Sequence, residues 1–261
     1  MFRIESSAVE SPQVVVEYYK SNAEFTSGEG ILYTEFMGEI ATRQISVLDS
    51  LYYPSASLSD ENDKIGFLLY DGKKSELELS DSQIISKDEF EAVWLIAMND
   101  HKEKEIIQYV TGDAAVPLSS ATIIAHIVNN KGKWGKGFVL SLSKKYPAAK
   151  KVYLDKYSNT SDLTLGDIQF ISVDEKDRIF VANMVSQDGI RKNHADKKQY
   201  LSYHALEECL EKLSEFALIN RLVVQMPKIG AGLGGGDWKH IESLIQKHLC
   251  YKLIKCTVVI L

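Results

Sequence analysis

The chain has 261 residues and a formal net charge of −6, from 30 lysines and arginines against 36 aspartates and glutamates. With 45% hydrophobic residues, 25% charged residues and only five prolines, its composition is that of a globular protein, which excludes collagen-like and broadly disordered chains. No apolar run reaches the about 18 residues of a membrane span, and the N-terminus lacks the pattern of a secretory signal, so we expect no membrane partner.

The cysteines indicate neither a metal site nor a disulfide framework. Cys209, Cys250 and Cys256 have no metal-ligand spacing, and their number is odd. We therefore expect no metal, no cofactor and a cytoplasmic location.

Charge is distributed unevenly along the chain. Residues 1–100 carry 7 basic and 19 acidic side chains, a net of −12, whereas residues 101–261 carry 23 basic and 17 acidic side chains, a net of +6. An asymmetry of this size predicts two modules with different surfaces. We expect the first module at residues 1–100 and the second at residues 105–261, with the polar segment 99–105 as the junction.

The first hundred residues have the pattern of a small α+β module. Short alternating runs, broken by Gly, Asp and Asn, predict strands within 28–49 and 64–80, and Asp71-Gly72 predicts a hairpin. Residues 86–100 have helical periodicity, with Ser86 as the expected N-cap and a glutamate three residues later.

From residue 105 onward, predicted strands alternate with predicted helices, which is the pattern of a three-layer α/β fold. The strands are expected within 105–113, 121–130, 165–187 (two strands around a turn at 174–177), 221–227 and 255–261, and the helices within 137–146, 147–157, 200–217 and from 237 onward.

The strongest chemical signal is the glycine-rich segment 229–238, Ile-Gly-Ala-Gly-Leu-Gly-Gly-Gly-Asp-Trp, which lies between a strand and a helix. Glycine lets the backbone adopt positive φ and approach a ligand closely, and the N–H groups of such a loop bind anions. A tight turn without a ligand is the alternative, although it needs fewer glycines. Because the spacing matches neither dinucleotide-binding nor P-loop motifs, we expect a phosphate loop of another type.

A second loop, Asn-Asn-Lys-Gly-Lys-Trp-Gly-Lys-Gly at 129–137, has similar chemistry. Its two amides can hydrogen-bond ribose hydroxyls, its three lysines supply positive charge, and Trp134 can shield the site or stack. A solvated basic turn is the alternative. The asparagine pair at the C-terminal end of a strand favours a ligand site, because α/β sheets bind ligands there.

Four segments in this order, followed by the terminal strand TVVIL, resemble the macrodomain family of ADP-ribose-binding modules. The resemblance covers about residues 105–261 and is greatest to small standalone macrodomains that act on ADP-ribose 1''-phosphate or ADP-ribosylated protein. It implies a three-layer α/β/α fold with a mixed six-stranded sheet that binds ADP-ribose at its strand ends. The segments are VTGDAA (110–115), IIAHIVNNKGKWGKGF (123–138), RIFVANMVSQDGIRK (178–192) and MPKIGAGLGGGDW (226–238).

The resemblance also implies which residues bind the ligand. Asp113 would accept from the adenine amino group, although a β-turn aspartate is an equal reading of the sequence alone. Segment 229–236 would cradle the diphosphate, segment 129–137 would surround the distal ribose, and 183–187 would form the far wall. The implied ligand-binding residues are Asp113, Ala114, Asn129, Asn130, Trp134, Gly135, Lys136, Gly137, Asn183, Met184, Ile229, Gly230, Ala231, Gly232, Leu233, Gly234 and Gly235.

The resemblance suggests two chemical routes. One branch of the family uses a lysine that attacks the anomeric carbon, assisted by an aspartate in the second glycine loop. In this sequence the lysine position falls near Ser186 or Gln187 and the aspartate position on Gly234, so we do not expect the covalent route. In the other route the substrate's own phosphate orients a water, and positioning and electrostatic terms carry the rate.

The substrate-assisted route fits the residues present. Asn130 and Lys136 are the catalytic candidates, and Asp188 or His194 is a further candidate for supplying a proton. The sequence therefore favours hydrolysis of ADP-ribosylated protein or ADP-ribose 1''-phosphate. The alternatives are a reader that binds ADP-ribose without turnover and, outside the family, a generic nucleotide-binding α/β protein.

Other conspicuous side chains have structural interpretations. We expect His126, His204 and Cys209 to be core residues, since none has a recognisable catalytic partner. The basic excess after residue 100 is small and lacks a nucleic-acid-binding motif, so we expect no sequence-specific nucleic acid partner. The acidic first module disfavours an anionic ligand of its own. It could cover the ligand crevice, recognise a protein substrate or aid solubility, and of these we expect a role in binding a protein substrate or partner.

Overall fold

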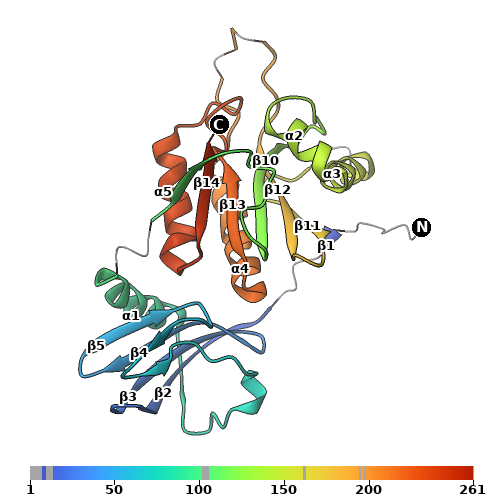
Figure 1. Ribbon diagram of the computed structural model, residues 1–261. Coiled ribbons are helices and arrows are strands. Elements are labelled where there is room, and N and C mark those ends of the chain that lie inside the picture. The colour runs from blue at the N-terminus through green and yellow to red at the C-terminus, as the bar shows by residue number, and fades with distance from the viewer. Residues whose placement is uncertain are drawn as a thin grey trace. The chain divides into compact units, whose positions relative to one another are not determined.

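The chain forms two compact units in the computed structural model, which describes residues 8–9, 14–101, 106–160, 163–193, 195–196 and 198–260 (Figure 1). The C-terminal unit consists of Ile107–Cys250 and Ile254–Leu261, together with β1 (Ala8–Val9). The N-terminal unit spans Pro12–Ile106 and also includes Tyr251–Leu253. The predicted junction at 99–105 includes residues 102–105, which lie outside the described ranges.

The C-terminal unit is built on a mixed sheet, in the order β1-β11-β12-β10-β13-β14-β9. The five strands from β12 to β9 are parallel, whereas β11 and β1 are antiparallel to their neighbours. The predicted six-stranded mixed sheet is therefore confirmed, with the short β1 as an added edge strand. The six strands are β9 (Gln108–Thr111), β10 (Thr122–Asn129), β11 (Ile168–Asp174), β12 (Ile179–Gln187), β13 (Val223–Pro227) and β14 (Cys256–Ile260).

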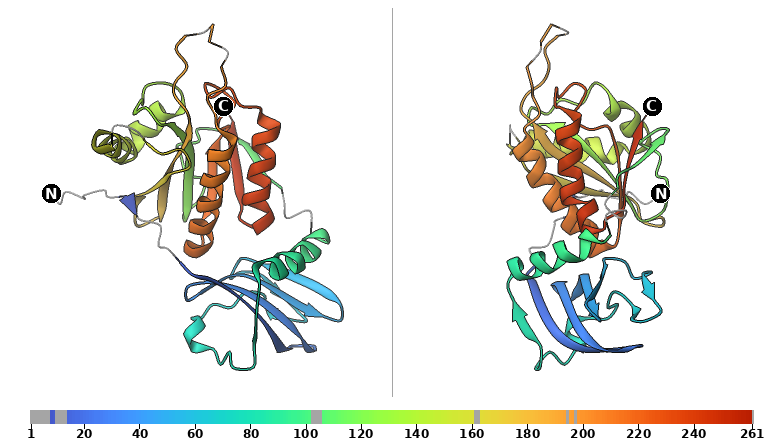
Figure 2. Two further views of the ribbon diagram at one scale, coloured as in Figure 1. Left: turned by 180° about the vertical axis from the view of Figure 1, so that it is seen from behind. Right: turned by 90° about the vertical axis from the view of Figure 1, so that its left-hand side faces the viewer.

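Helices cover both faces of this sheet, as the two views of Figure 2 show. Alternate residues of β12 point to opposite faces. Val181 and Val185 pack with residues of α2 and α3, whereas the ring of Phe180 contacts Phe216 of α4. The three-layer α/β/α prediction is thus confirmed. The helices are α2 (Phe138–Lys145), α3 (Pro147–Thr160), α4 (Tyr203–Asn220) and α5 (Trp238–His248), followed by the 3-10 turn η3 (Cys250–Lys252).

The parallel strands bring the candidate loops to one edge of the sheet. Strands β9, β10, β12, β13 and β14 run in the same direction, so the loops that follow them leave at the same edge, which we call the carboxyl edge. Ligands of open α/β sheets bind at this edge.

Two of the three expected core residues of this unit are in the core. His126 is buried, and so is Cys209, whose thiol donates to the Asp167 carbonyl at 3.3 Å; burial raises the pKa of the Cys209 thiol to about 12. The expectation for His204 was wrong. Its side chain is 85% exposed and lies 3.7 Å from Glu208, because it falls on the outer face of α4.

The N-terminal unit is a five-stranded antiparallel sheet, in the order β5-β4-β3-β2-β8, with one helix. The helix α1 (Lys87–Asn99) begins where the sequence predicts, with the Ser86 hydroxyl accepting from the Glu89 N–H at 3.1 Å. The strands are β2 (Val16–Phe25), β3 (Gly28–Met37), β4 (Ile40–Leu48), β5 (Leu51–Ser55) and β8 (Gln83–Ile85), and β6 (Glu61–Asn62) pairs separately with β7 (Gly66–Phe67).

The hairpin predicted at Asp71-Gly72 is absent from the structure. Between β7 and β8 the chain forms the 3-10 turn η1 (Lys74–Glu76) and an isolated bridge from Lys73 to Ile40. Leu68 and Leu69 are both buried, and they pack in two clusters against the sheet rather than alternating along a strand. The apolar run therefore covers the sheet instead of extending it.

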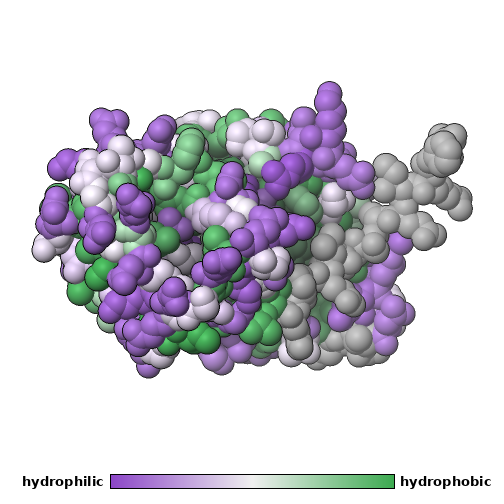
Figure 3. Space-filling view, turned by 90° about the horizontal axis from the view of Figure 1, so that it is seen from below, coloured by the Kyte–Doolittle hydropathy of each residue, from purple (hydrophilic) through white to green (hydrophobic). Residues whose placement is uncertain are grey.

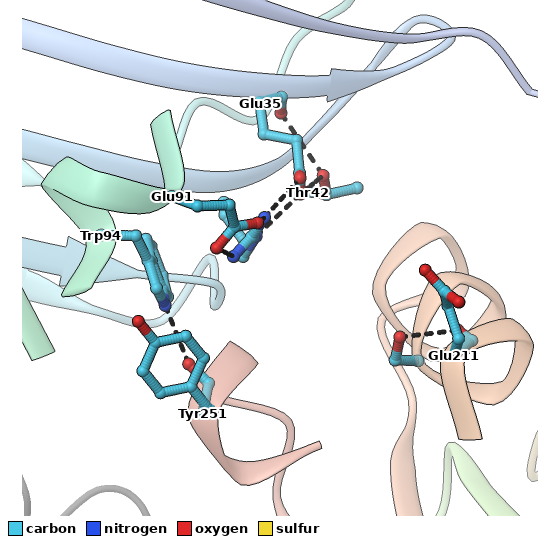
Figure 4. A network of polar contacts seen from close by, with 8 residues as sticks. Glu35, Thr42, Glu91, Trp94, Glu211 and Tyr251 are labelled. Carbon is cyan, nitrogen blue, oxygen red and sulfur yellow. Dashed lines mark hydrogen bonds and ion pairs between the residues drawn. The ribbon is translucent and has the colours of Figure 1, made fainter. Parts of the chain in front are cut away.

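A buried ion cluster lies between this sheet and α1 (Figure 4). The Arg43 guanidinium contacts the carboxylate of Glu35 at 2.6 Å and that of Glu91 at 2.6 Å, and the Thr42 hydroxyl donates to Glu35 at 2.8 Å. The Arg43 and Glu35 side chains are each 2% exposed. Burial alone would raise the pKa of Glu35, but the Arg43 guanidinium outweighs it and holds that pKa below its ordinary value.

The segment Tyr251–Leu253, which precedes β14 in the chain, belongs to the core of the N-terminal unit. The Trp94 indole donates to the Tyr251 carbonyl at 2.8 Å, and the side chains of Tyr251 and Leu253 pack against the cluster around Phe90 and Trp94 (Figure 4). The core of this unit is thus completed by a segment whose Tyr251 lies 157 positions from Trp94 in the sequence.

Apolar side chains on the surface are scattered. Phe67 and Ile84 are each about 70% exposed, and Figure 3 shows hydrophilic and hydrophobic side chains interspersed over the face that it presents. No helix in the described part of the chain combines the length and the apolar character that crossing a membrane requires.

Removing the guanidinium of Arg43 should destabilise the N-terminal unit strongly. In Arg43→Met the Glu35 carboxylate stays buried without its counter-ion, which typically costs about 3–5 kcal/mol. Urea unfolding measures this loss, and hydrogen exchange of β3 and β4 assigns it to this unit. A Glu35→Leu/Arg43→Met double variant is the control and should recover most of it, and a single variant as stable as wild type would contradict a structural role for the cluster.

Acid should remove the same contribution from the wild-type protein. Because the folded pKa of Glu35 is lowered from 4.5, the stabilisation is complete above that pH and is lost as the pH falls through the lower folded value. The double variant should lack this part of the acid dependence.

Candidate functional site

Three loops at the carboxyl edge carry the candidate site. We call residues 131–137, after β10, the lysine loop; residues 188–201, after β12, the projecting loop; and residues 228–236, after β13, the glycine loop. Figure 1 shows the projecting loop extending beyond the strand ends, between β12 and α4.

The glycine loop presents backbone donors. It folds on itself through hydrogen bonds from the Gly235 N–H to the Gly232 carbonyl at 3.2 Å and from the Gly236 N–H to the Gly230 carbonyl at 3.0 Å. The N–H groups of Gly232, Leu233 and Gly234 have no acceptor among the described residues. Consecutive unpaired N–H groups next to a helix N-terminus form a binding site for anions.

The loop requires glycine at some positions and not at others. Gly230 and Gly235 both have φ of +70°, a conformation that favours glycine. A Cβ on Gly234 would lie 2.9 Å from the Gly230 carbonyl oxygen, whereas a Cβ on Gly232 would meet nothing within 4 Å. Helix α5 follows at once, capped by the Asp237 carboxylate, which accepts from the His240 N–H at 2.9 Å.

Asn129 organises the lysine loop from within. Its Oδ1 accepts from the N–H groups of Lys131 and Lys133 at 3.0 and 3.1 Å, and its Nδ2 donates to the Lys133 carbonyl at 2.7 Å. The Tyr153 hydroxyl of α3 donates to the Asn129 carbonyl at 2.6 Å. Polar atoms of Asn129 are therefore used inside the protein, and they give the loop a fixed shape.

Trp134 is buried beneath the lysine loop rather than open to a ligand. Its indole donates to the Val139 carbonyl at 3.0 Å, and its ring contacts His126 edge-on and Tyr153 at an angle. The next three residues, Gly135, Lys136 and Gly137, are exposed. The exposed part of this loop thus comprises Lys133 and residues 135–137, and the latter lead into α2.

Asn130 joins the lysine loop to the projecting loop. It is 7% exposed, its Nδ2 donates to the Asp188 carboxylate at 3.0 Å, and its Oδ1 accepts from the Gly189 N–H at 2.9 Å. The Asn130 N–H also donates to the Gln187 carbonyl at 3.0 Å. The orientation of this amide is fixed, since a carboxylate only accepts and an N–H only donates.

The projecting loop is joined in turn to the glycine loop. The N–H groups of Tyr200 and Leu201 both donate to the Gly234 carbonyl, at 2.8 and 3.0 Å. The three loops are therefore linked by hydrogen bonds into one surface.

Asp113 occupies a turn after β9 at the same edge. Its carboxylate accepts from the Ala115 N–H and from the Ser141 hydroxyl, each at 2.9 Å, and its carbonyl accepts from the Val116 N–H. The side chain is exposed, and its contacts within the turn are those expected of a β-turn aspartate. The neighbouring Ala114 is buried, with its carbonyl accepting from Gln225 at 2.8 Å.

Asn183 and Met184 lie in the protein interior and not on the far wall of the ligand site, where the resemblance places them. Both have 0% exposure, within strand β12. Asn183 accepts from the His126 Nε2 at 2.6 Å and donates to the Ala149 carbonyl at 3.0 Å, so its amide links the sheet to α3. Burial lowers the pKa of His126 to about 4, which keeps the imidazole neutral at physiological pH.

Comparisons with known proteins cover the C-terminal unit. A macrodomain protein from Streptomyces coelicolor is 33% identical, with a TM-score of 0.51 and 98% of its chain covered by 59% of this one. A protein of unknown function from Bacteroides thetaiotaomicron is 39% identical, with a TM-score of 0.56 over 60% of this chain and 98% of its own. The family model described as Macro domain matches residues 125–245. The chain belongs to the macrodomain family.

Curated relatives of this macrodomain differ in length. An ADP-ribose 1''-phosphate phosphatase of Meyerozyma guilliermondii is 32% identical over 163 residues, 54% of this chain and 93% of the relative. The mouse chromodomain-helicase-DNA-binding protein 1-like is 31% identical over 153 residues, and the aligned region spans only 16% of its length.

The structure links two parts of the predicted macrodomain site by hydrogen bonds and places other predicted residues in the interior. Asn130 and the glycine loop are each hydrogen-bonded to the projecting loop, whereas Asn183 and Met184 lie in the interior. His194, a predicted proton donor, lies outside the described residues.

Sequence reasoning missed Gln225, which shapes the turn that carries Asp113. This buried side chain donates to the carbonyls of Ala114 and Val116 and accepts from the Leu118 N–H. Its one signal was a polar residue inside the apolar strand β13. In the described ranges no group of three or more His, Cys, Asp or Glu side chains is placed to hold a metal ion.

Gly232 and Gly234 of the glycine loop should differ in their tolerance of a methyl group, because only Gly232 has free space around the position of a Cβ. Gly234→Ala should lower stability by about 1–3 kcal/mol because its Cβ meets backbone, and Gly232→Ala should change it by less than about 0.5 kcal/mol. Thermal unfolding measures both. Equal losses in the two variants would show that the loop adopts another conformation.

Proposed function

We propose that this macrodomain binds ADP-ribose and hydrolyses an ADP-ribose derivative, either ADP-ribosylated protein or ADP-ribose 1''-phosphate. The observation that carries the proposal is the row of unpaired N–H groups at Gly232, Leu233 and Gly234. A diphosphate is an anionic ligand that fits such donors. The phosphatase name of the Meyerozyma relative, 32% identical to this chain, supports this substrate class.

The ligand would extend from the glycine loop in two directions. The turn at Asp113 would receive the adenine, since the exposed carboxylate has acceptor capacity beyond its two present donors. The distal ribose would lie between the glycine loop and residues 135–137. Asn130 would then act from the junction of the loops, and the exposed Lys136 would supply positive charge.

The chemistry would be the addition of water at C1'' of the distal ribose. The water oxygen forms the new bond to C1'', and the bond from C1'' to the leaving oxygen breaks. The proton of the water goes to the leaving group, giving ADP-ribose with either inorganic phosphate or a free carboxylic acid. A phosphate group of the substrate would orient the water, so that positioning rather than a strong side-chain base lowers the barrier.

A non-catalytic reader is the second candidate. Ser186 or Gln187 stands where the covalent branch of the family has its lysine, and Gly234 stands where that branch has its aspartate. These positions favour binding without covalent turnover. Product formation distinguishes the two functions.

A carboxylate on the glycine loop should abolish binding of ADP-ribose. Gly232→Glu places a negative charge against the diphosphate at a position where an added Cβ would meet nothing within 4 Å, so the fold should be retained. Like charges placed together cost several kcal/mol, so we expect an affinity loss of about 100-fold or more by calorimetry. Gly232→Ala is the matched control, and unchanged affinity in Gly232→Glu would exclude this loop as the diphosphate site.

Asn130 and Asp188 should act as one unit in turnover. For ADP-ribose 1''-phosphate, Asn130→Ala should lower kcat by about 100-fold, and Asp188→Ala should lower it by less. The double variant should be no slower than Asn130→Ala, because each residue acts through the 3.0 Å contact between them. Losses of kcat that multiply in the double variant would contradict this coupling. If wild-type protein binds ADP-ribose but forms no product from either substrate, the non-catalytic reader is the remaining function.

A further inference from the structure

Four exposed lysines lie on two of the loops that carry the proposed site. Lys133 and Lys136 of the lysine loop and Lys192 and Lys198 of the projecting loop are all exposed. None of the four forms an ion pair with a carboxylate in the part of the chain that the structure describes. Exposed lysines elsewhere are of both kinds: Lys151 and Lys247 pair with neighbouring carboxylates, whereas Lys176 and Lys255 form no ion pair with the described residues.

One carboxylate fixes the projecting loop without neutralising it. Asp196 accepts from the Tyr200 hydroxyl at 2.6 Å and from the N–H groups of Lys192 and Lys198, each at 3.1 Å. Hydrogen bonds from Tyr200 and from these N–H groups lower the pKa of Asp196. The same carboxylate thus holds both lysine backbones, while their ammonium groups make no ion pair with it.

The projecting loop is placed to contact the group that is attached to ADP-ribose. At one end of the loop Asp188 accepts a hydrogen bond from Asn130, and at the other end the Tyr200 N–H donates to the Gly234 carbonyl. Both ends therefore lie at the proposed ADP-ribose site. Its described residues then extend beyond the strand ends (Figures 1 and 2). A side chain on this loop therefore meets what is attached to ADP-ribose rather than the nucleotide itself.

We propose that Lys133, Lys136, Lys192 and Lys198 form a binding surface for an acidic polypeptide segment that carries the ADP-ribose. This inference rests on the proposed function and names the substrate class: modified side chains flanked by aspartate and glutamate. Unpaired cations on a fixed loop attract carboxylates, and the attraction weakens as salt screens it.

The side chains favour a polypeptide over a nucleic acid strand. Single-stranded nucleic acid is held by exposed aromatic rings on which bases stack, and Trp134 and Tyr200, which supply aromatic rings to these two loops, are both buried. Phosphate groups also favour the bidentate fork of arginine. The arginine of this loop, Arg191, donates its Nε to the Asp196 carbonyl at 2.8 Å.

The test compares Lys192→Gln/Lys198→Gln with wild type and with a matched control, Lys176→Gln/Lys255→Gln. The control lysines are also exposed, but they lie before β12 and β14, at the opposite edge of the sheet. The ligands are free ADP-ribose, a mono-ADP-ribosylated peptide with acidic flanks, the same peptide with serine and glycine flanks, the unmodified acidic peptide, and an ADP-ribosylated single-stranded oligonucleotide. Affinities are measured by calorimetry and fluorescence anisotropy at two salt concentrations.

We expect wild type and control to bind the acidic modified peptide more tightly than the neutral one. Lys192→Gln/Lys198→Gln should lose about 2- to 30-fold of affinity for the acidic peptide, in a salt-dependent manner, with unchanged affinity for free ADP-ribose. Equal binding of acidic and neutral peptides, or tighter binding of the oligonucleotide, would overturn the proposal.

The free ligand and the unmodified peptide distinguish the two proposals. Failure of free ADP-ribose to bind would reject the proposed function by itself. The unmodified acidic peptide then tests the lysine surface alone: its binding should weaken in Lys192→Gln/Lys198→Gln but not in the control. Equal binding in these two variants would reject the surface.

Discussion

The candidate site depends on hydrogen bonds that join three separate loops. Asn130 supplies one junction, through an amide that Asp188 and Gly189 hold from both sides, and the Gly234 carbonyl supplies the other. Each loop follows a different parallel strand and has hydrogen bonds of its own, but the position of one loop relative to another depends on the contacts between them. Without these contacts, the glycine loop would still present its N–H donors, but the neighbouring loops would have no fixed position beside it, and a ligand could not contact all of them.

The same structure shows how polar groups are divided between scaffold and surface. Asn129, Asn183 and Trp134 have the chemistry of ligand-binding residues, yet their polar atoms are used to hold the lysine loop, α3 and α2 in place. The groups left for a ligand are mostly backbone N–H groups and exposed lysines. Recognition by backbone donors suits a diphosphate, because its charge needs a fixed array of donors more than it needs particular side chains.

The N-terminal unit has a different organising constraint. A buried arginine pairs with two carboxylates between its sheet and helix, and Tyr251–Leu253 completes its core. Two of its acidic side chains therefore serve an ion cluster in which Arg43 compensates their charge. The acidic composition predicted a separate module but gave no indication that Glu35 and Glu91 serve a buried cluster rather than the surface.

Local sequence determined the strands and helices of the macrodomain, the cap of α1, and the chemistry of the glycine loop. Those features depend on periodicity, on side chains that cap nearby N–H groups, and on the conformational freedom of glycine. Tertiary structure decided the rest. It placed Asn183 in the interior and His204 on the surface, turned Leu68 and Leu69 onto a sheet instead of into a hairpin, and set Asp188 against Asn130. Burial and pairing across distant segments depend on which elements pack together, and no short stretch of sequence contains that information.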